Sequence, residues 1–291
     1  MPAITAQLFV QLQKLLPKYL LTSMIRWLAG IRIVAVKNFL IRRFVNLYKV
    51  DIDELRHPVP EGFATFNDFF IRALAPDARN IDESVTSIVS PVDGTVSAAG
   101  RIDRKRIFQA KGLDYTLTDL LATDTSEAEH YIDGSFATIY LAPYNYHRIH
   151  APVSGRLIAA RYVPGSLYSV NDATVRHLPQ LFACNERLIC HLQTDAGKMV
   201  LIFVGAMNVG TIYSKWTGDI RPRKYGIVED LAIDNDGSGA VFRKGDTIGW
   251  FNMGSTVILL TPPGACDNFD ELEAGKTVEM GQPIGEILTP R

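Results

Sequence analysis

A serine that follows a glycine near the end of the chain is the residue best suited to chemistry. Gly254 and Ser255 lie at the head of a strand-like apolar run, Val257–Leu260. A serine hydroxyl becomes a nucleophile when a base takes its proton, and glycine tolerates backbone shapes that other residues avoid. The pair therefore suggests a chain that cuts its own Gly254–Ser255 bond. From these residues alone, an inert hydroxyl in a buried strand is the alternative.

Two other segments supply residues for proton transfer. His147 and His150 lie three residues apart, and histidine is the side chain best matched to proton transfer near neutral pH. Asp93 precedes Gly94 in a turn, and a carboxylate can hold an imidazole in one tautomer and stabilise its charged form. These residues form a candidate relay with Ser255. A structural turn and hydrogen-bonded core histidines are the alternatives, because sequence spacing does not show that the segments meet.

The cysteines indicate neither a disulfide framework nor a metal site. Their number is odd, no C-x-x-C pair occurs, and no His/Cys cluster has metal-ligand spacing. We expect a reducing compartment and no bound metal. Buried structural thiols are the expected role of Cys184, Cys190 and Cys266.

The elements that must position these residues are mostly strands. Residues 66–72 predict a short helix, and from about residue 88 short apolar runs alternate with Gly and Pro. Strands are predicted at 138–141, 157–163, 188–192, 200–204 and 256–260. The expected fold class is α+β, with a β-rich sandwich or barrel-like body over residues 51–291. A non-catalytic carrier-like β sandwich is an alternative, although no lysine occupies a carrier-type hairpin.

The first 50 residues differ from the rest in charge. They contain eight Lys and Arg residues and no Asp or Glu, so their net charge is +8 while the whole chain is −1. Residues 4–28 and 27–49 predict amphipathic helices, and no stretch reaches the ~20 apolar residues of a spanning helix. We expect them to lie on an anionic membrane surface. Packing on the body and a transit peptide are the alternatives. No nucleic-acid partner is expected.

In order along the chain, several motifs resemble the bacterial-type phosphatidylserine decarboxylases, and the likeness covers nearly the whole sequence. One departure is Met253, where the family commonly has Leu, a swap of similar volume. The motifs are Thr65–Phe70, Pro91–Gly94, Gln109–Gly112, Tyr146–His150, Tyr162–Asn171, Asn185–Arg187, Val204–Ala206 and Gly254–Val257.

The resemblance implies a self-processing proenzyme. Asp93, His150 and Ser255 match the family's self-cleavage relay, which would divide the chain into residues 1–254 and 255–291 and convert Ser255 into a covalent pyruvoyl group. That cofactor forms a Schiff base with phosphatidylserine, releases carbon dioxide and yields phosphatidylethanolamine in phospholipid biosynthesis. His147 is the candidate proton donor.

The resemblance also implies where the protein acts and with what. It suggests peripheral association with the cytoplasmic face of the cell membrane and a homodimer, with the two cleavage chains as partners. A serine hydrolase or protease uses similar parts and is the alternative enzyme. It fits less well because Ser255 lacks a G-x-S-x-G setting.

Overall fold

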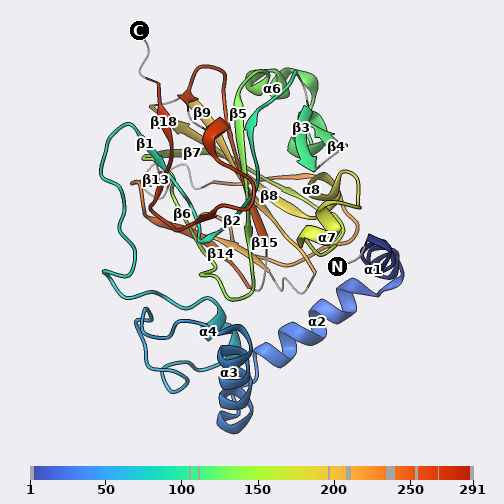
Figure 1. Ribbon diagram of the computed structural model, residues 1–291, viewed down its shortest axis with the longest axis vertical. Coiled ribbons are helices and arrows are strands. Elements are labelled where there is room, and N and C mark those ends of the chain that lie inside the picture. Colours follow the sequence, from blue (N-terminus) through green and yellow to red (C-terminus); the bar gives the residue numbers. More distant parts are fainter. Residues whose placement is uncertain are drawn as a thin grey trace.

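The computed structural model describes residues 3–104, 106–110, 112–195, 197–207, 211–233, 240–252, 255–267 and 269–288. N-terminal helices lead into a body of antiparallel sheets (Figure 1). The predicted α+β class is confirmed. Among the described residues the sheets are open, and none closes into a barrel.

The largest sheet holds the site. Its strands run in the order β12-β7-β8-β9-β15-β5-β2-β17, with β13 added beside β7, and all pairs are antiparallel. Every residue of β15 is buried, which explains its continuous apolar run. The five predicted strands all lie in this sheet. Its members are β2 (Gly94–Arg101), β5 (Ser135–Leu141), β7 (Gly155–Val163), β8 (Arg187–Thr194), β9 (Gly197–Val204), β12 (Glu229–Leu231), β13 (Val241–Phe242), β15 (Ser255–Thr261) and β17 (Thr277–Val278).

Two smaller sheets and a hairpin complete the β body. One sheet has the order β11-β10-β14-β6 and the other β1-β18-β16. Buried residues from both sheets join those of the large sheet in one apolar core. The strands are β1 (Ser87–Val89), β3 (Arg106–Ala110), β4 (Leu113–Thr116), β6 (Arg148–His150), β10 (Ile212–Ser214), β11 (Gly218–Ile220), β14 (Thr247–Phe251), β16 (Cys266–Asp267) and β18 (Pro283–Ile287).

Short helices connect these strands. Three of them are preceded by capping residues whose side chains accept backbone N–H groups, namely Thr116, Asp124 and Asn171. The short helices are α5 (Leu117–Leu121), α6 (Thr125–Ala128), α7 (Asp172–Val175) and α8 (Leu181–Cys184), with 3-10 turns η1 (Glu129–Tyr131) and η2 (Phe269–Glu271). The three cysteines form no disulfide, and Cys184 is exposed, so the expectation that all three are buried is wrong for Cys184.

The N-terminal region forms three helices, α1 (Ala3–Leu15), α2 (Lys18–Ala29) and α3 (Val34–Tyr48), followed by the short α4 (Phe66–Phe70). The predicted helix over 4–28 is interrupted at Pro17, because proline has no N–H to donate and its ring obstructs the preceding turn. The short helix predicted near 66–72 is confirmed. In Figure 1, α2 runs from α1, beside α7, to α3 and α4 at the end of the molecule opposite the C-terminus.

Part of this region packs on the protein itself. The Gln13 side chain donates to Thr174 Oγ1 at 3.0 Å and accepts from the Ser169 N–H at 2.8 Å, which fastens α1 to the body. Phe44 of α3 packs edge-on against Phe69 of α4. The packing alternative is therefore true for one side of these helices.

Lys37 lies on the packed side of α3. It is buried, and its ammonium donates to the carbonyl of Pro60 at 2.9 Å. The apolar side chains that face solvent lie elsewhere: Leu15 is 83%, Trp27 73% and Phe39 67% exposed.

Within the described residues no individual helix has the length and apolarity for a membrane span. Taken together, α2 and α3 do, but they meet at a bend of 113°.

Candidate active site

Strand register places the start of β15 beside the turn that carries Asp93. Ser255 pairs with Leu141 of β5, and β2, on the other side of β5, pairs Thr95 with Tyr140. Neighbouring strands are about 4.8 Å apart, so the backbones of Ser255 and the Asp93 turn flank Leu141 at roughly 10 Å from each other. The structure thus brings together two of the three segments that sequence spacing could not connect.

The histidine segment meets the same junction. The backbone N–H of His150 donates to the carbonyl of Pro91 at 2.8 Å, which ties the end of β6 to the Asp93 turn. The carbonyl of His147 accepts from the N–H of Phe251 at 3.3 Å, just before the connection from β14 to β15. All three predicted segments therefore converge where the large sheet meets the sheet of β6 and β14.

Ser255 is fully buried, and its Oγ has no hydrogen-bond partner among the described residues. The neighbouring Thr256 hydroxyl is in the same state. Buried polar atoms are normally paired, so an unpaired one calls for an explanation, and a catalytic role is one of those available. Gly254 and Met253 lie outside the described residues.

The ring of His150 has two hydrogen-bond partners, one near in sequence and one 95 residues away. Its Nδ1 lies 2.7 Å from the carbonyl of Gly245, and its Nε2 lies 2.9 Å from the hydroxyl of Tyr146. A carbonyl only accepts, so Nδ1 carries the proton and Nε2 accepts from Tyr146. Burial lowers the pKa of His150, while its hydrogen bond to the Gly245 carbonyl and, to a smaller extent, the charge of Asp93 oppose that shift. The ring is therefore neutral, with its basic nitrogen at Nε2.

Gly245 can present this carbonyl because it has no side chain. Its φ is +83°, and a Cβ there would lie 2.4 Å from Cδ1 of Ile81. Its N–H also donates to the carbonyl of Ala151 at 2.9 Å, beside the histidine strand. The turn around Gly245, and not Asp93, fixes the tautomer of His150.

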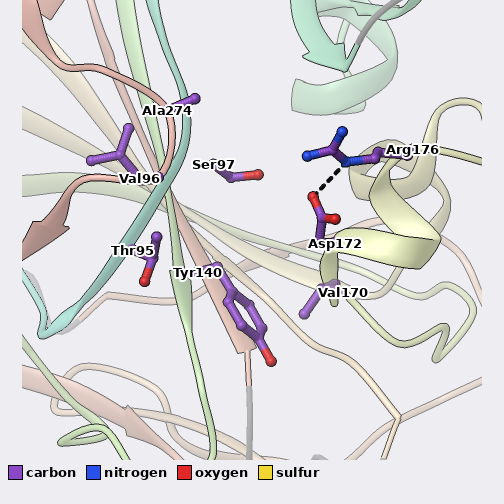
Figure 2. A pocket seen from close by; sticks show the side chains of 9 residues that line it. Thr95, Val96, Ser97, Tyr140, Val170, Asp172, Arg176 and Ala274 are labelled. Carbon is purple, nitrogen blue, oxygen red and sulfur yellow. Dashed lines mark hydrogen bonds and ion pairs between the residues drawn. The ribbon is translucent and has the colours of Figure 1, made fainter. Parts of the chain in front are cut away.

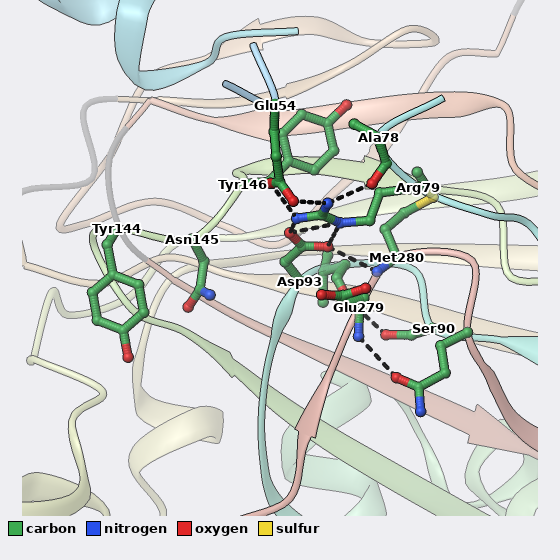
Figure 3. Close-up of polar contacts among 12 residues, drawn as sticks. Glu54, Ala78, Arg79, Ser90, Asp93, Tyr144, Asn145, Tyr146, Glu279 and Met280 are labelled. Carbon is green, nitrogen blue, oxygen red and sulfur yellow. Dashed lines mark hydrogen bonds and ion pairs between the residues drawn. The ribbon is translucent and has the colours of Figure 1, made fainter. Parts of the chain in front are cut away.

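Asp93 pairs with an arginine instead of His150 (Figure 3). The Arg79 guanidinium donates through Nη2 to Oδ2 at 2.6 Å and through Nε to Oδ1 at 3.1 Å. The backbone N–H of Met280 donates to Oδ1 at 2.8 Å. Asp93 is buried, so these donors compensate the desolvation of its charge.

His147 is enclosed by protein. Its ring stacks on Phe70 with centroids 4.2 Å apart, and neither ring nitrogen makes a hydrogen bond of ordinary geometry among the described residues. Burial lowers the pKa of His147 to about 3, and the charge of Arg72 adds to the shift; the nearby carbonyls of Pro143 and Ala142 oppose it. The imidazole of His147 is therefore neutral near pH 7 and enclosed, with both nitrogens unpaired.

Three neighbours of the relay were not predicted as site residues. Tyr146 stands directly before His147, so its position in the resembling motif was the available signal. Gly245 had a weaker signal, as the first residue of a glycine-containing turn. Arg79 lies outside every motif named above, and only folding brings it to Asp93.

The segment Asn185–Arg187 has a supporting role. The Asn185 amide donates to the carbonyls of Tyr168 and Gly205, each at 2.9 Å. The Glu186 carboxyl accepts from the Tyr162 hydroxyl at 2.9 Å, and burial raises its pKa to about 8. Gly205 directly follows β9, the strand beside β15, so these bonds brace that side of Ser255.

A pocket of about 310 Å³ borders β2 and β5 of the large sheet (Figure 2). Thr95 and Tyr140 line one side, and an ion pair from Asp172 to Arg176 lines the other, with Nε and Oδ1 2.7 Å apart. The pocket therefore offers hydroxyls and both signs of charge.

No group of three His, Cys, Asp or Glu residues within the described ranges could hold a metal ion.

The features above define an α+β protein with a buried serine at the start of a central strand and two buried histidines on a segment that meets the same junction. Comparison with known proteins identifies its family. The phosphatidylserine decarboxylase family model matches residues 66–286, and a second model, PSD, matches residues 8–49. The chain belongs to the phosphatidylserine decarboxylase family and is thus an enzyme, a carboxy-lyase of phospholipid biosynthesis.

Individual relatives match over almost their full length. The phosphatidylserine decarboxylase proenzyme of Methylococcus capsulatus is 44% identical over 285 residues, 98% of each chain. That of Acidovorax ebreus is 45% identical over 272 residues, 94% of this chain and 95% of the relative. That of Saccharophagus degradans is 41% identical over 282 residues, 97% of this chain and 98% of the relative. The expected family and enzyme class are confirmed.

Proposed function

We propose that the chain is a proenzyme that cleaves itself between Gly254 and Ser255 and then decarboxylates phosphatidylserine to phosphatidylethanolamine. The observation that carries the proposal is the buried, unpaired hydroxyl of Ser255 at the junction with Asp93 and His150, in a chain with this family membership. The proenzyme names of the relatives support it.

Self-cleavage begins with proton transfer from Ser255 Oγ to Nε2 of His150. The Oγ bonds to the carbonyl carbon of Gly254, the peptide C–N bond breaks, and the nitrogen takes the proton back from the imidazolium. The resulting ester undergoes elimination, which frees the Gly254 carboxylate, and hydrolysis then releases ammonia and leaves a ketone at residue 255. Because Tyr146 occupies Nε2 in the arrangement described, it must release that nitrogen first.

The two products are expected to stay together. Residues 255–291 include β15, which is buried between β9 and β5, and β18, which pairs with β1. Removing this chain would expose the centre of the large sheet to water. We propose that it remains in place, carrying the pyruvoyl group, and that the processed protein forms a homodimer.

The pyruvoyl group would be made from Ser255 itself, so it would lie at the buried position that this serine occupies. A pyruvoyl carbonyl there would supply an electron sink for the loss of carbon dioxide from an amino acid headgroup. His147 is our candidate to donate the proton that replaces the carboxylate, since its unpaired nitrogens lie in the same junction. Phe70 holds its ring, and the buried surroundings exclude water that would otherwise compete for this proton.

The first test is the mass of the purified wild-type protein under denaturing conditions. We expect two pieces, residues 1–254 and a 255–291 chain with a pyruvoyl start, together with release of carbon dioxide from phosphatidylserine. One intact chain with no ketone would refute the proposal and favour a carrier-like sandwich. Degradation of added peptides would favour a protease.

The N-terminal helices are proposed to hold the enzyme on the cytoplasmic face of the membrane, where its lipid substrate stays. Exposed apolar side chains of these helices would enter the acyl boundary while their exposed lysines and arginines face lipid phosphates. Each such cation contributes about 1 kcal/mol near an anionic surface.

Replacing Leu15, Trp27 and Phe39 together by glutamine is expected to weaken vesicle binding by at least roughly tenfold. Each is a large exposed side chain, and burying one is worth about 1.5–3 kcal/mol. Co-sedimentation with phosphatidylserine–phosphatidylcholine vesicles measures the change. The matched control is Val85→Ser, which removes an exposed apolar side chain from the body. Equal binding of the triple variant and wild type would contradict membrane docking through this surface.

A further inference from the structure

A partly buried charge cluster next to the relay joins the region after the N-terminal helices to Asp93. Glu54 lies between α3 and α4, and Arg79 lies between α4 and β1. The Arg79 side chain bridges two carboxylates, those of Asp93 and Glu54 (Figure 3). The cluster consists of Glu54, Arg79 and Asp93.

Arg79 is held with every donor occupied. Its Nη1 donates to Glu54 Oε1 at 2.8 Å and to the carbonyl of Ala78 at 2.6 Å, and its Nη2 donates to Glu54 Oε2 at 3.0 Å and to Asp93. With the Nε bond to Asp93, these contacts use all five guanidinium N–H groups. Burial opposes the charge on Arg79, but its hydrogen bonds to Asp93 and Glu54 prevail and raise its pKa. The guanidinium is thus fixed in orientation as well as in charge.

The charges in this cluster do not cancel. Among these three side chains, two carboxylates and one guanidinium leave one net negative charge. The buried guanidinium of Arg72 also acts on both carboxylates, while its Nη2 donates to the carbonyls of Tyr144 and Asn145. The turn that carries Asp93 is hydrogen-bonded to the backbone of His150. Self-cleavage puts a positive charge on His150 while the serine proton resides there. A nearby negative charge stabilises that imidazolium. If Glu54 were absent, Arg79 would neutralise Asp93 and this stabilisation would largely be lost.

We infer that Arg79 and Glu54 are positioning residues for self-cleavage: Arg79 orients the Asp93 carboxylate, and Glu54 balances Arg79 so that the charge of Asp93 remains available to His150. The inference rests on the proposed function. It makes the maturation of the enzyme depend on the segment that follows its N-terminal helices, because Glu54 belongs to that segment. The backbone of Glu54 is itself fixed, since its carbonyl accepts from the N–H of Ala75 at 2.8 Å.

Glu54→Gln provides the main test. The full-length chain is synthesised in a cell-free system, and conversion of precursor into the two pieces is followed on denaturing gels over time. We expect cleavage to slow by roughly 10-fold to 100-fold, the size associated with loss of one neighbouring charge. The matched control is Glu229→Gln, which removes the carboxylate from the Arg223–Glu229 pair on the body and is expected to mature at the wild-type rate.

Arg79→Ala tests orientation separately. It should slow cleavage at least as much as Glu54→Gln, and added methylguanidinium should restore part of the rate through the adjoining 210 Å³ cavity that Arg79 and Asp93 line. Tetramethylammonium at equal ionic strength should not. Arg79→Lys should mature at an intermediate rate, because lysine keeps the positive charge but lacks the planar guanidinium that orients the carboxylate. If the substitution had damaged the fold in general, methylguanidinium would not selectively restore the cleavage rate.

The outcomes separate this inference from the proposed function. Wild-type maturation of Glu54→Gln overturns the inference, and this variant decides the matter if Arg79→Ala does not fold. Maturation of Arg79→Ala at the wild-type rate also overturns it. Asp93→Asn serves as the reference: if it alone is slow, the relay stands and the roles of Arg79 and Glu54 are rejected. If Asp93→Asn matures normally, the relay assignment fails as well.

Discussion

Ser255→Ala is expected to remain one uncut chain of 291 residues and to lose decarboxylase activity. The substitution removes the nucleophile and with it the source of the ketone. Activity should fall by roughly 10⁶-fold or more, the lower end of typical enzymatic acceleration. Folding should not suffer, because the hydroxyl lost is buried and unpaired. Denaturing mass spectrometry and carbon dioxide release measure the two effects.

The control for this variant is Thr138→Val, which removes a buried hydroxyl from the adjacent strand β5 while preserving volume. It is expected to be cut and active. A cleaved Ser255→Ala protein, or an uncut one that still releases carbon dioxide at the wild-type rate, would remove Ser255 from both reactions.

His147→Phe is expected to separate maturation from catalysis. The new ring can still stack on Phe70, whereas both imidazole nitrogens are gone. We expect the chain to be cut normally and decarboxylation to slow by roughly 10²- to 10⁴-fold, the usual contribution of a positioned acid or base. Burial lowers the pKa of His147 to about 3, so the titration of this ring should leave no inflection near pH 6.5 in the wild-type rate profile.

His150→Ala provides the opposite pattern, since it removes the base and should leave precursor uncut. Purified His147→Phe and His150→Ala are compared by mass, by thermal unfolding and by turnover. Full turnover in cut His147→Phe would eliminate the proton-donor role, and an uncut but folded His147→Phe would move this residue into the cleavage step.

Local patterns predicted the elements well where neighbouring residues decide them. The buried run in β15 and the short helix α4 follow from apolar composition and spacing, which act over a few residues. The prediction of one helix over 4–28 was wrong at Pro17, although a proline is itself a local signal for a break in a helix. The burial of Lys37 could not be predicted locally, because the carbonyl that accepts its hydrogen bond belongs to Pro60, 23 residues away.

From the sequence alone came the residue types that can perform the chemistry, their order along the chain and the family they resemble. These depend on identity and local spacing, so folding was not needed to read them. Only the tertiary structure decided the partners: Gly245 and Tyr146 hold His150, while Arg79 holds Asp93. Hydrogen bonds are short and directional, and these pairs depend on strand register and loop packing between segments as far apart as 95 residues.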